Sequence, residues 1–207
     1  MPSIPPATWL LIVANVVVFI VQLGAGDTLI RHFALWPLGV SPDLVPGAVV
    51  GTFQAWQLVT YSFLHGSFTH LFLNMLALFM FGSDLERLFG TRRYLAYYFA
   101  AVLAAAITQL VVSATGGALY PTVGASGGVF GLLLAYGIHF PRRTIVLLFP
   151  PIPMPAWLFV IVYAAIELYL GVTGTQAGVA HFAHLGGMIG GWLMLRYWRR
   201  RPASSRG

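Results

Sequence analysis

The chain has 207 residues, of which 58% are hydrophobic and 8% charged, and it carries a net charge of +6 and no cysteine. This composition lies far outside the range of soluble domains, so lipid is the expected solvent for most of the chain. The lack of cysteine excludes a disulfide framework, an iron–sulfur cluster and a thiol nucleophile.

Long apolar runs predict an all-α polytopic membrane protein built as a bundle of six transmembrane helices. A cleaved signal peptide is the rival interpretation of residues 1–26, but such a peptide opens with Lys or Arg, and the first such residue here is Arg31. The fourth and fifth runs are short for a complete crossing. The predicted helices span residues 7–23, 56–81, 94–112, 127–140, 156–170 and 179–198, in a single membrane domain, 1–198, followed by a basic cytoplasmic tail, 199–207.

The connection between the first two predicted helices, residues 24–55, is the one long loop. It contains Trp36, Phe53 and three prolines. Because a structureless loop of this length is uncommon, we expect an amphipathic, membrane-associated element that packs on or in the outer leaflet.

The arginines predict the topology. All eleven basic residues are arginine, and all but Arg31 lie at or beyond the ends of the second, fourth and sixth predicted helices. By the positive-inside rule these regions face the cytoplasm, which puts both termini inside. Arginines at helix ends indicate topology and lipid head-group contacts rather than nucleic-acid binding. The all-arginine set and the compact six-helix length suit a prokaryotic plasma membrane.

Polar side chains inside a bilayer are costly, so each is a candidate for function. Counted at about 1.5 Å per residue from the charged cytoplasmic helix ends, Ser126 lies about 24 Å deep, His70 about 21 Å and His184 about 18 Å. These side chains share one layer of a hydrocarbon core of about 30 Å, nearer its outer face. Asn74 lies four residues after His70 and shares its helix face, whereas His65, five residues before His70, is expected to point away.

Small residues accompany these polar positions. Gly127 and Gly131 follow Ser126 on the fourth predicted helix. Gly187 and Gly191 lie on the same face of the sixth predicted helix as His184. Small residues four apart let two membrane helices approach closely, which a direct Ser–His hydrogen bond requires.

The fourth predicted helix is too short to cross the bilayer, so Ser126 should lie at its N-terminus, on the floor of a cavity open to the outside. Its backbone N–H is then one of the unpaired donors of a helix start. This arrangement is typical of nucleophilic catalysis, with His184 as general base. The Ser126 N–H, His70 and Asn74 would form the oxyanion hole.

At these residues the sequence resembles the rhomboid family of intramembrane serine proteases. The matching segments are "HGSFTHLFLN" (65–74), "GASG" (124–127) and "AHLGGMIGG" (183–191), in the family's order on helices 2, 4 and 6. The resemblance implies a rhomboid-like bundle in which a Ser126–His184 dyad cuts transmembrane segments of client membrane proteins, with no metal or other cofactor. The supporting residues that it implies are His65, Gly124, Gly127, Phe130, Gly187 and Gly191.

The sequence departs from the family pattern at two places. Family members often carry Tyr four residues after the serine, stacked on the catalytic histidine, and here this residue is Phe130, which keeps the ring and loses the hydroxyl. The Trp-Arg pair of the long loop is replaced by Trp56-Gln57. His65 is expected to be structural, capping or pinning this loop.

Two further polar residues lie near the predicted dyad. His181, three residues before His184, competes with it for the role of base. Glu167 lies at a depth of about 18 Å and could be the acid of a triad. We expect instead a buried polar contact or a water-facing position for Glu167, because helix 156–170 is expected to border the substrate entrance rather than back the histidine.

Other functional classes fit less well. The G-x-S-x-G elbow of soluble hydrolases needs a preceding strand and an α/β sheet. The "GAGD" segment, 24–27, resembles intramembrane aspartyl proteases, which need a second membrane-embedded Asp, and no His is followed by Glu as zinc proteases require. A transporter predicts internal repeats and paired charges. The main alternative is a non-catalytic rhomboid-like protein that binds membrane clients, although such proteins typically lack the Ser or the His. The client and the oligomeric state stay open.

Overall fold

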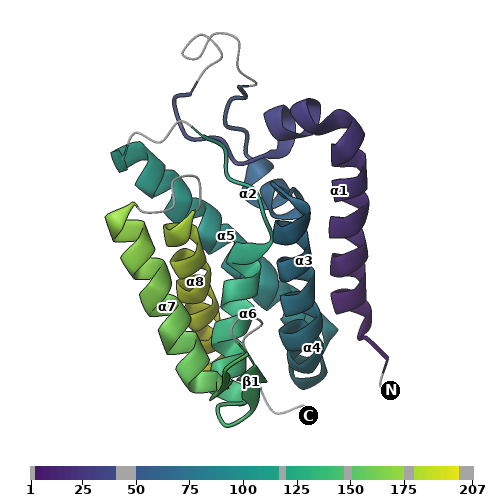
Figure 1. Ribbon diagram of the computed structural model, residues 1–207, viewed down its shortest axis with the longest axis vertical. Coiled ribbons are helices and arrows are strands. Elements are labelled where there is room, and N and C mark those ends of the chain that lie inside the picture. The colour runs from purple at the N-terminus through teal and green to yellow at the C-terminus, as the bar shows by residue number, and fades with distance from the viewer. Residues whose placement is uncertain (1–2, 41–49, 117–119, 147–150, 175–179, 201–207) are drawn as a thin grey trace.

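Helices account for most of the chain in the computed structural model, which describes residues 3–40, 50–116, 120–146, 151–174 and 180–200 (Figure 1). The α-helices are α1 (Pro6–Phe33), α2 (Gln57–Thr60), α3 (Phe68–Ala77), α4 (Ser83–Phe89), α5 (Thr91–Gly116), α6 (Ser126–His139), α7 (Ala156–Thr173) and α8 (His181–Arg200). A 3₁₀ turn, η2 (Tyr61–Phe63), follows α2, and a π-helical turn, η3 (Leu78–Gly82), joins α3 to α4.

Four helical stretches of the described chain are long and apolar enough to cross a membrane. They are α1, the continuous stretch Phe68–Phe89, α5 and α7. The apolar helix α6 has only 14 residues. Helix α8 has 20 residues, but its two histidines and its terminal arginines lower its mean hydropathy. The protein is therefore a mostly helical, multi-pass integral membrane protein.

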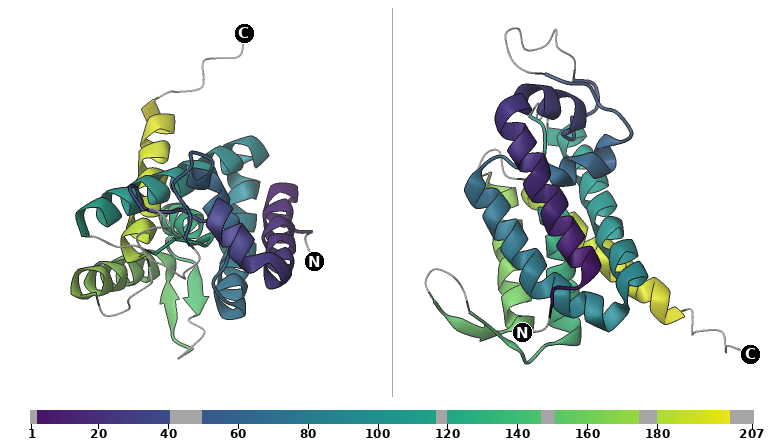
Figure 2. Two further views of the ribbon diagram at one scale, coloured as in Figure 1. Left: turned by 90° about the horizontal axis from the view of Figure 1, so that it is seen from above. Right: turned by 90° about the vertical axis from the view of Figure 1, so that its right-hand side faces the viewer.

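Helix α6 lies in the middle of the bundle, against α5, α8, α7 and the η3 turn (Figures 1 and 2). Its 14 residues extend about 21 Å at 1.5 Å per residue, less than the hydrocarbon thickness of about 30 Å. Most of its side chains are buried, which explains why it is apolar on all sides. Its N-terminus can therefore lie inside the bilayer while its C-terminus reaches one surface.

The expected second helix, 56–81, is wrong as a single element. The turn that follows α2 ends at Leu64, whose backbone is extended (φ −88°, ψ 151°). A new helix begins after Ser67, and the Ser67 hydroxyl accepts a hydrogen bond from the His70 N–H at 3.1 Å. This N-cap starts α3 within an apolar stretch. His65 consequently lies in a loop and not on a helix face.

The first part of the connection 24–55 is helical, because α1 continues to Phe33 after a kink at Ala25 (φ −132°, ψ 31°). The expected amphipathic element stays a prediction, and residues 41–49 lie outside the described residues. The tail 199–207 is likewise described only as far as Arg200.

Gln57 anchors this connection. Its side chain is fully buried, and its Oε1 accepts a hydrogen bond from the backbone N–H of Trp36 at 3.2 Å. Its Nε2 donates to the carbonyl oxygens of His32, at 3.2 Å, and Thr52, at 3.0 Å. A neutral amide therefore ties together both sides of the loop at the position where the Trp-Arg signature has a guanidinium. The neighbouring Trp56 indole donates to the same His32 carbonyl at 2.9 Å.

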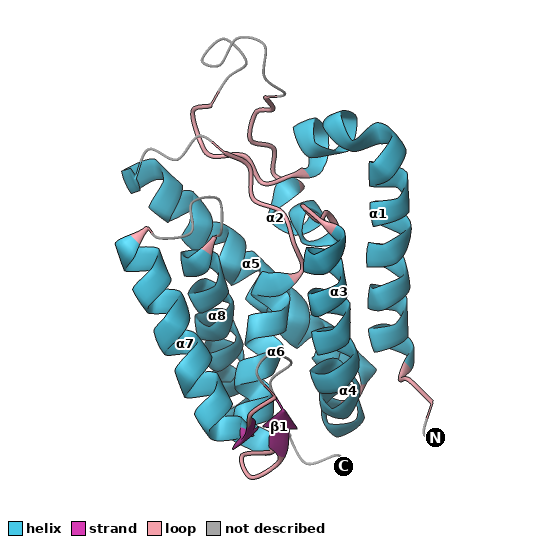
Figure 3. Cartoon of the chain, in the orientation of Figure 1, coloured by secondary structure: helices cyan, strands magenta, loops and turns pink. Residues whose placement is uncertain are grey.

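A short hairpin follows α6 and was not expected from the sequence. Strand β1 (Thr144–Val146) pairs antiparallel with β2 (Pro153–Pro155), with Ile145 opposite Met154 (Figure 3). Two three-residue strands produce too little alternation to be recognised from sequence alone. The hairpin buries Ile145 against the bundle and leads directly into α7.

The arginine-bearing regions lie at one end of the bundle. Arg93, at the start of α5, lies over the Trp198 ring near the end of α8, 5.8 Å from its centroid. Arg143, after α6, forms an ion pair with Asp84 of α4. Arg87 donates to the Ser3 carbonyl at 2.9 Å, which brings the chain before α1 to the same end.

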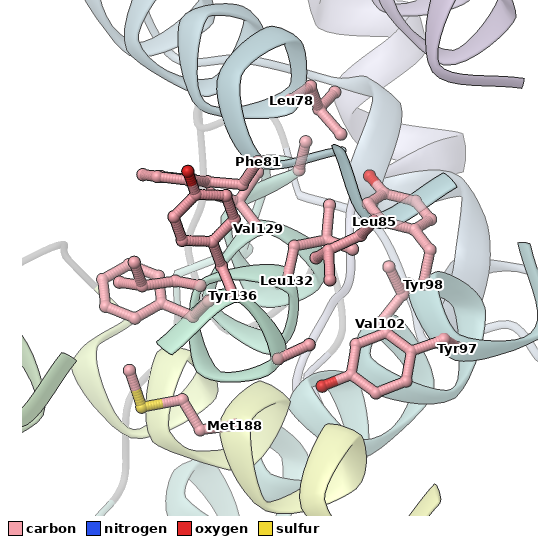
Figure 4. Packing of buried hydrophobic residues seen from close by; sticks show 14 of the residues in the cluster. Leu78, Phe81, Leu85, Tyr97, Tyr98, Val102, Val129, Leu132, Tyr136 and Met188 are labelled. Atoms are coloured by element: carbon pink, nitrogen blue, oxygen red, sulfur yellow. The ribbon is translucent and has the colours of Figure 1, made fainter. Parts of the chain in front are cut away.

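The core between α4, α5 and α6 is built from large aromatic and aliphatic side chains (Figure 4). Tyr97 and Tyr98 of α5 are fully buried, and the Tyr97 hydroxyl donates to the Gly131 carbonyl of α6 at 2.7 Å. This bond satisfies the polar end of a tyrosine that is otherwise surrounded by apolar groups.

Glu86 of α4 holds the start of α1. Its carboxylate accepts hydrogen bonds from the N–H groups of Ala7 at 3.0 Å and Thr8 at 2.7 Å, and from the hydroxyls of Thr8 and Thr91. The first N–H groups of a helix have no partner within the helix, and a carboxylate also favours the positive end of the helix dipole. Glu86 thus caps α1 from another part of the chain.

Glu86→Gln should destabilise the bundle, because a neutral amide is a weaker acceptor and turns an N–H toward the helix start. We expect a loss of about 1.5–3 kcal/mol in the free energy of unfolding, measured as a lower thermal midpoint in detergent micelles. Asp27→Asn is the matched control, because Asp27 is exposed on α1 and should change stability by less than about 0.5 kcal/mol. Equal midpoints for the two variants would contradict the capping role.

Candidate active site

The first residue of α6 and the first turn of α8 bring together a serine and a histidine. The Nε2 atom of His184 lies 2.8 Å from the Ser126 hydroxyl oxygen, a hydrogen-bonding distance. Because Ser126 opens α6, its backbone N–H has no acceptor within the helix. A hydroxyl next to an imidazole acceptor and a helix N-terminus can act as an activated nucleophile.

Glycines allow this contact. A Cβ atom on Gly187 would collide with the carbonyl oxygen of Gly127, and a Cβ on Gly127 would lie 2.5 Å from the Ala105 Cβ. One turn further along, a Cβ on Gly191 would lie 3.4 Å from the Cα of Gly131 and would collide with a tyrosine hydroxyl. Backbone therefore packs on backbone where α6 crosses α8, as small residues permit in membrane helices.

Phe130 orients the imidazole. Its ring is stacked on His184, with centroids 4.4 Å apart and planes inclined by 4°. Phe130 lies four residues after Ser126, so it projects from the same face of α6. The aromatic face alone produces this contact, so loss of the tyrosine hydroxyl leaves it intact.

His70 and Asn74 line a cavity of about 620 Å³ together with Ser126 and His184. Asn74 Nδ2 donates to the His70 carbonyl at 2.9 Å, which uses one of the two N–H groups of its amide. The cavity thus collects the four side chains predicted for the dyad and the oxyanion hole, from α3, α6 and α8.

Gly124 supports the His70 ring. Its φ is +126°, a conformation that other residues rarely adopt, and an added Cβ would lie 2.6 Å from the Cε1 atom of His70. The chain before Ser126 can therefore pass beneath the imidazole only because residue 124 has no side chain.

His65 lies beside His70, contrary to the expectation that it points away. The two rings meet edge to face with centroids 5.0 Å apart. Gln22 of α1 pins the His65 backbone, donating to its carbonyl at 2.8 Å and accepting its N–H at 3.1 Å. Burial, followed by repulsion from a charged His70, lowers the pKa of His65 to about 4. His65 is therefore a neutral packing residue at neutral pH.

Glu167 is a buried polar contact, and its partners are two histidines. Its Oε2 atom lies 2.9 Å from the Nδ1 of His184 and 2.6 Å from the Nδ1 of His181. The expectation that helix 156–170 does not back the histidine was wrong, because α7 packs on α8 at this level. Sequence spacing could not indicate this contact, since it depends on which helices become neighbours.

The same three residues contain a donor set that metals use. Their ligating atoms lie within 4.8 Å of one another, and two imidazoles with a carboxylate suit a transition metal. Hydrogen bonds from both rings to one carboxylate oxygen already satisfy these atoms. A metal would have to displace both protons.

Comparison with known proteins identifies the family. Residues 52–201 match the rhomboid domain. The chain belongs to the rhomboid family.

Its rhomboid relatives are distant. The chain is 28% identical to Rhomboid protease GluP of Bacillus subtilis, over 91% of this chain and 34% of that protein. It is 31% identical to the mitochondrial Rhomboid protein 1 of Saccharomyces cerevisiae (66% and 40%) and 27% identical to Rhomboid protease GlpG of Yersinia pestis (96% and 64%). The chain thus spans about one third to two thirds of the length of these relatives.

Gly187→Ala in this rhomboid should push α8 away from α6 and lengthen the Ser126–His184 contact. We expect a loss of about 1–3 kcal/mol in stability. We also expect modification of Ser126 by a fluorophosphonate to slow roughly 100-fold, because small misplacements of reacting groups are costly. Gly116→Ala is the control, because a Cβ there meets open space. If both variants behave alike, the close helix crossing is not what positions the pair.

Proposed function

We propose that the protein is an intramembrane serine endopeptidase that hydrolyses peptide bonds in or near transmembrane segments of client membrane proteins through a Ser126–His184 dyad. The observation that carries this proposal is the 2.8 Å contact between His184 Nε2 and the Ser126 hydroxyl, at a cavity within a membrane-embedded bundle. Similarity to the rhomboid proteases GluP and GlpG supports it.

The first step is attack on the client carbonyl. His184 accepts the Ser126 hydroxyl proton at Nε2 as the hydroxyl oxygen forms its bond to the carbonyl carbon. The carbonyl π electrons move to its oxygen, which becomes an oxyanion. The Phe130 stack holds the imidazole plane fixed while its charge changes.

The oxyanion needs donors that are in place beforehand. In this proposal they are the Ser126 N–H at the start of α6, the Asn74 amide and the His70 ring. Helix α3 presents both side chains to the cavity, and Gly124 supports the imidazole from below.

Collapse of the tetrahedral intermediate releases the amine. His184 returns its proton to the leaving nitrogen, and a water molecule deprotonated by the same imidazole then hydrolyses the acyl-enzyme. Entry of water to a site at membrane depth is consistent with the short α6, whose N-terminus lies below the ends of its neighbours (Figure 1).

A client helix has to unwind locally, because its peptide bonds are hydrogen-bonded and shielded. Small or helix-breaking residues near its outer end lower this cost. We propose lateral entry past α7 or beneath the connection 24–55. In this arrangement the domain 1–198 lies in the plasma membrane of a prokaryote, α6 begins inside the bilayer, and the arginine-bearing end faces the cytoplasm.

Covalent labelling tests the dyad without knowledge of the client. A fluorophosphonate probe should modify the detergent-solubilised wild type and lose at least about 100-fold in rate with Ser126→Ala or His184→Ala. Circular dichroism and thermal midpoints verify that the variants are folded. Folded wild type that stays unlabelled would contradict the proposal and favour a non-catalytic, client-binding rhomboid.

The oxyanion donors are tested by turnover of a transmembrane peptide substrate once labelling has succeeded. Asn74→Ala and His70→Ala should each lower kcat about 100-fold or more, because removal of one donor weakens binding of the transition state. Phe72→Ala on the exposed face of α3 is the control and should retain kcat. Unchanged kcat in both site variants would remove these residues from the oxyanion hole.

A further inference from the structure

Glu167 and Ser126 lie at the two nitrogens of the His184 ring, which points to a role that a two-residue mechanism does not contain. The carboxylate contacts one nitrogen of the His184 ring, and the serine contacts the other. We infer that Glu167 is a positioning residue that makes the Ser126–His184 pair a Ser–His–Glu triad, an inference that rests on the proposed function.

The hydrogen bond fixes the tautomer of His184. A carboxylate only accepts hydrogen bonds, so the Nδ1 atom at 2.9 Å from Glu167 has to carry the proton. In the neutral ring the Nε2 atom is then unprotonated, and it faces the Ser126 hydroxyl at 2.8 Å. The contact thus holds His184 in the form that can accept the serine proton.

His181 holds the Glu167 carboxylate from a second position on α8. Its Nδ1 lies 2.6 Å from the same carboxylate oxygen that His184 contacts. A carboxylate only accepts hydrogen bonds, so His181 donates from Nδ1 and fixes the carboxylate beside the His184 ring.

In the proposed reaction the negative charge of Glu167 comes to face a cationic His184. When the Ser126 proton moves to Nε2, His184 becomes an imidazolium next to the carboxylate, and no proton passes to Glu167. In a buried site such an attraction is stronger than in water. An interaction that is stronger in the transition state than in the ground state raises the rate of the chemical step.

The burial of the Glu167 side chain supports a positioning role in the site rather than a role at the protein surface. Glu167 is 8% exposed, whereas the flanking apolar residues Ile166 and Leu168 of the same helix are exposed. An ionisable group in such a membrane segment is energetically costly, so its presence indicates a function. Its two imidazole partners account for its position.

The experiment is inactivation of the full-length protein by a fluorophosphonate probe in dodecyl maltoside, with kinact and KI measured separately. Glu167→Gln keeps the shape and removes the charge. We expect kinact to fall on the order of 100- to 10,000-fold, with KI unchanged. The matched control is Glu86→Gln, the same change at a buried carboxylate outside the site, and its folded fraction should retain the wild-type kinact.

The tautomer gives a second measurement that needs no variant at position 167. Long-range ¹H–¹⁵N spectra of ¹⁵N-histidine-labelled protein should show the His184 ring protonated at Nδ1, with assignment by loss of the signal in His184→Ala. An Nε2-protonated His184, or a wild-type kinact in Glu167→Gln, would overturn the inference. Wild-type protein that does not react with the probe would instead contradict the proposed function.

Discussion

The approach of α6 to α8 is the constraint on which the rest of the site depends. In lipid, apolar surfaces gain little from meeting each other, so helices associate through close packing and hydrogen bonds. Backbone contact between Gly127 and Gly187 provides that packing one residue from the serine and three residues from the histidine. The hydrogen bond between the two side chains follows from how near the two backbones lie.

Each further part of the site is attached to this crossing from a different helix. Helix α3 brings His70 and Asn74 to the cavity, and α7 brings Glu167 to the far side of the His184 ring. The Gln57 amide and the Glu86 carboxylate then hold the connection and the first helix around this centre. Gln57 and Glu86 are therefore buried polar groups that join elements of the bundle, whereas Glu167 belongs to the site.

The sequence predicts the helical membrane architecture well, because apolar runs report burial in lipid directly. It predicts Ser126, His70 and His184 as one layer, because helix rise converts residue counts into depth. It fails at Leu64, because apolar residues on both sides of the short segment 65–67 are joined into one run, although the Ser67 cap is a readable signal. It predicts a buried polar contact for Glu167 but not its histidine partners, because depth alone cannot say which helices are neighbours in the membrane plane.

Helix α7 is weakly packed and yet contributes a side chain to the site. Buried residues make up 22% of the most apolar stretch of α7 and 39% of that of α5, so α7 is the less firmly held helix. Its Glu167 nevertheless contacts His184. A client that displaced α7 on entry would pull the carboxylate from His184 and leave the serine unactivated. Bond cleavage would then have to wait until α7 returned to its position with the client bound. Transmembrane segments that leave the site before this return would stay uncut.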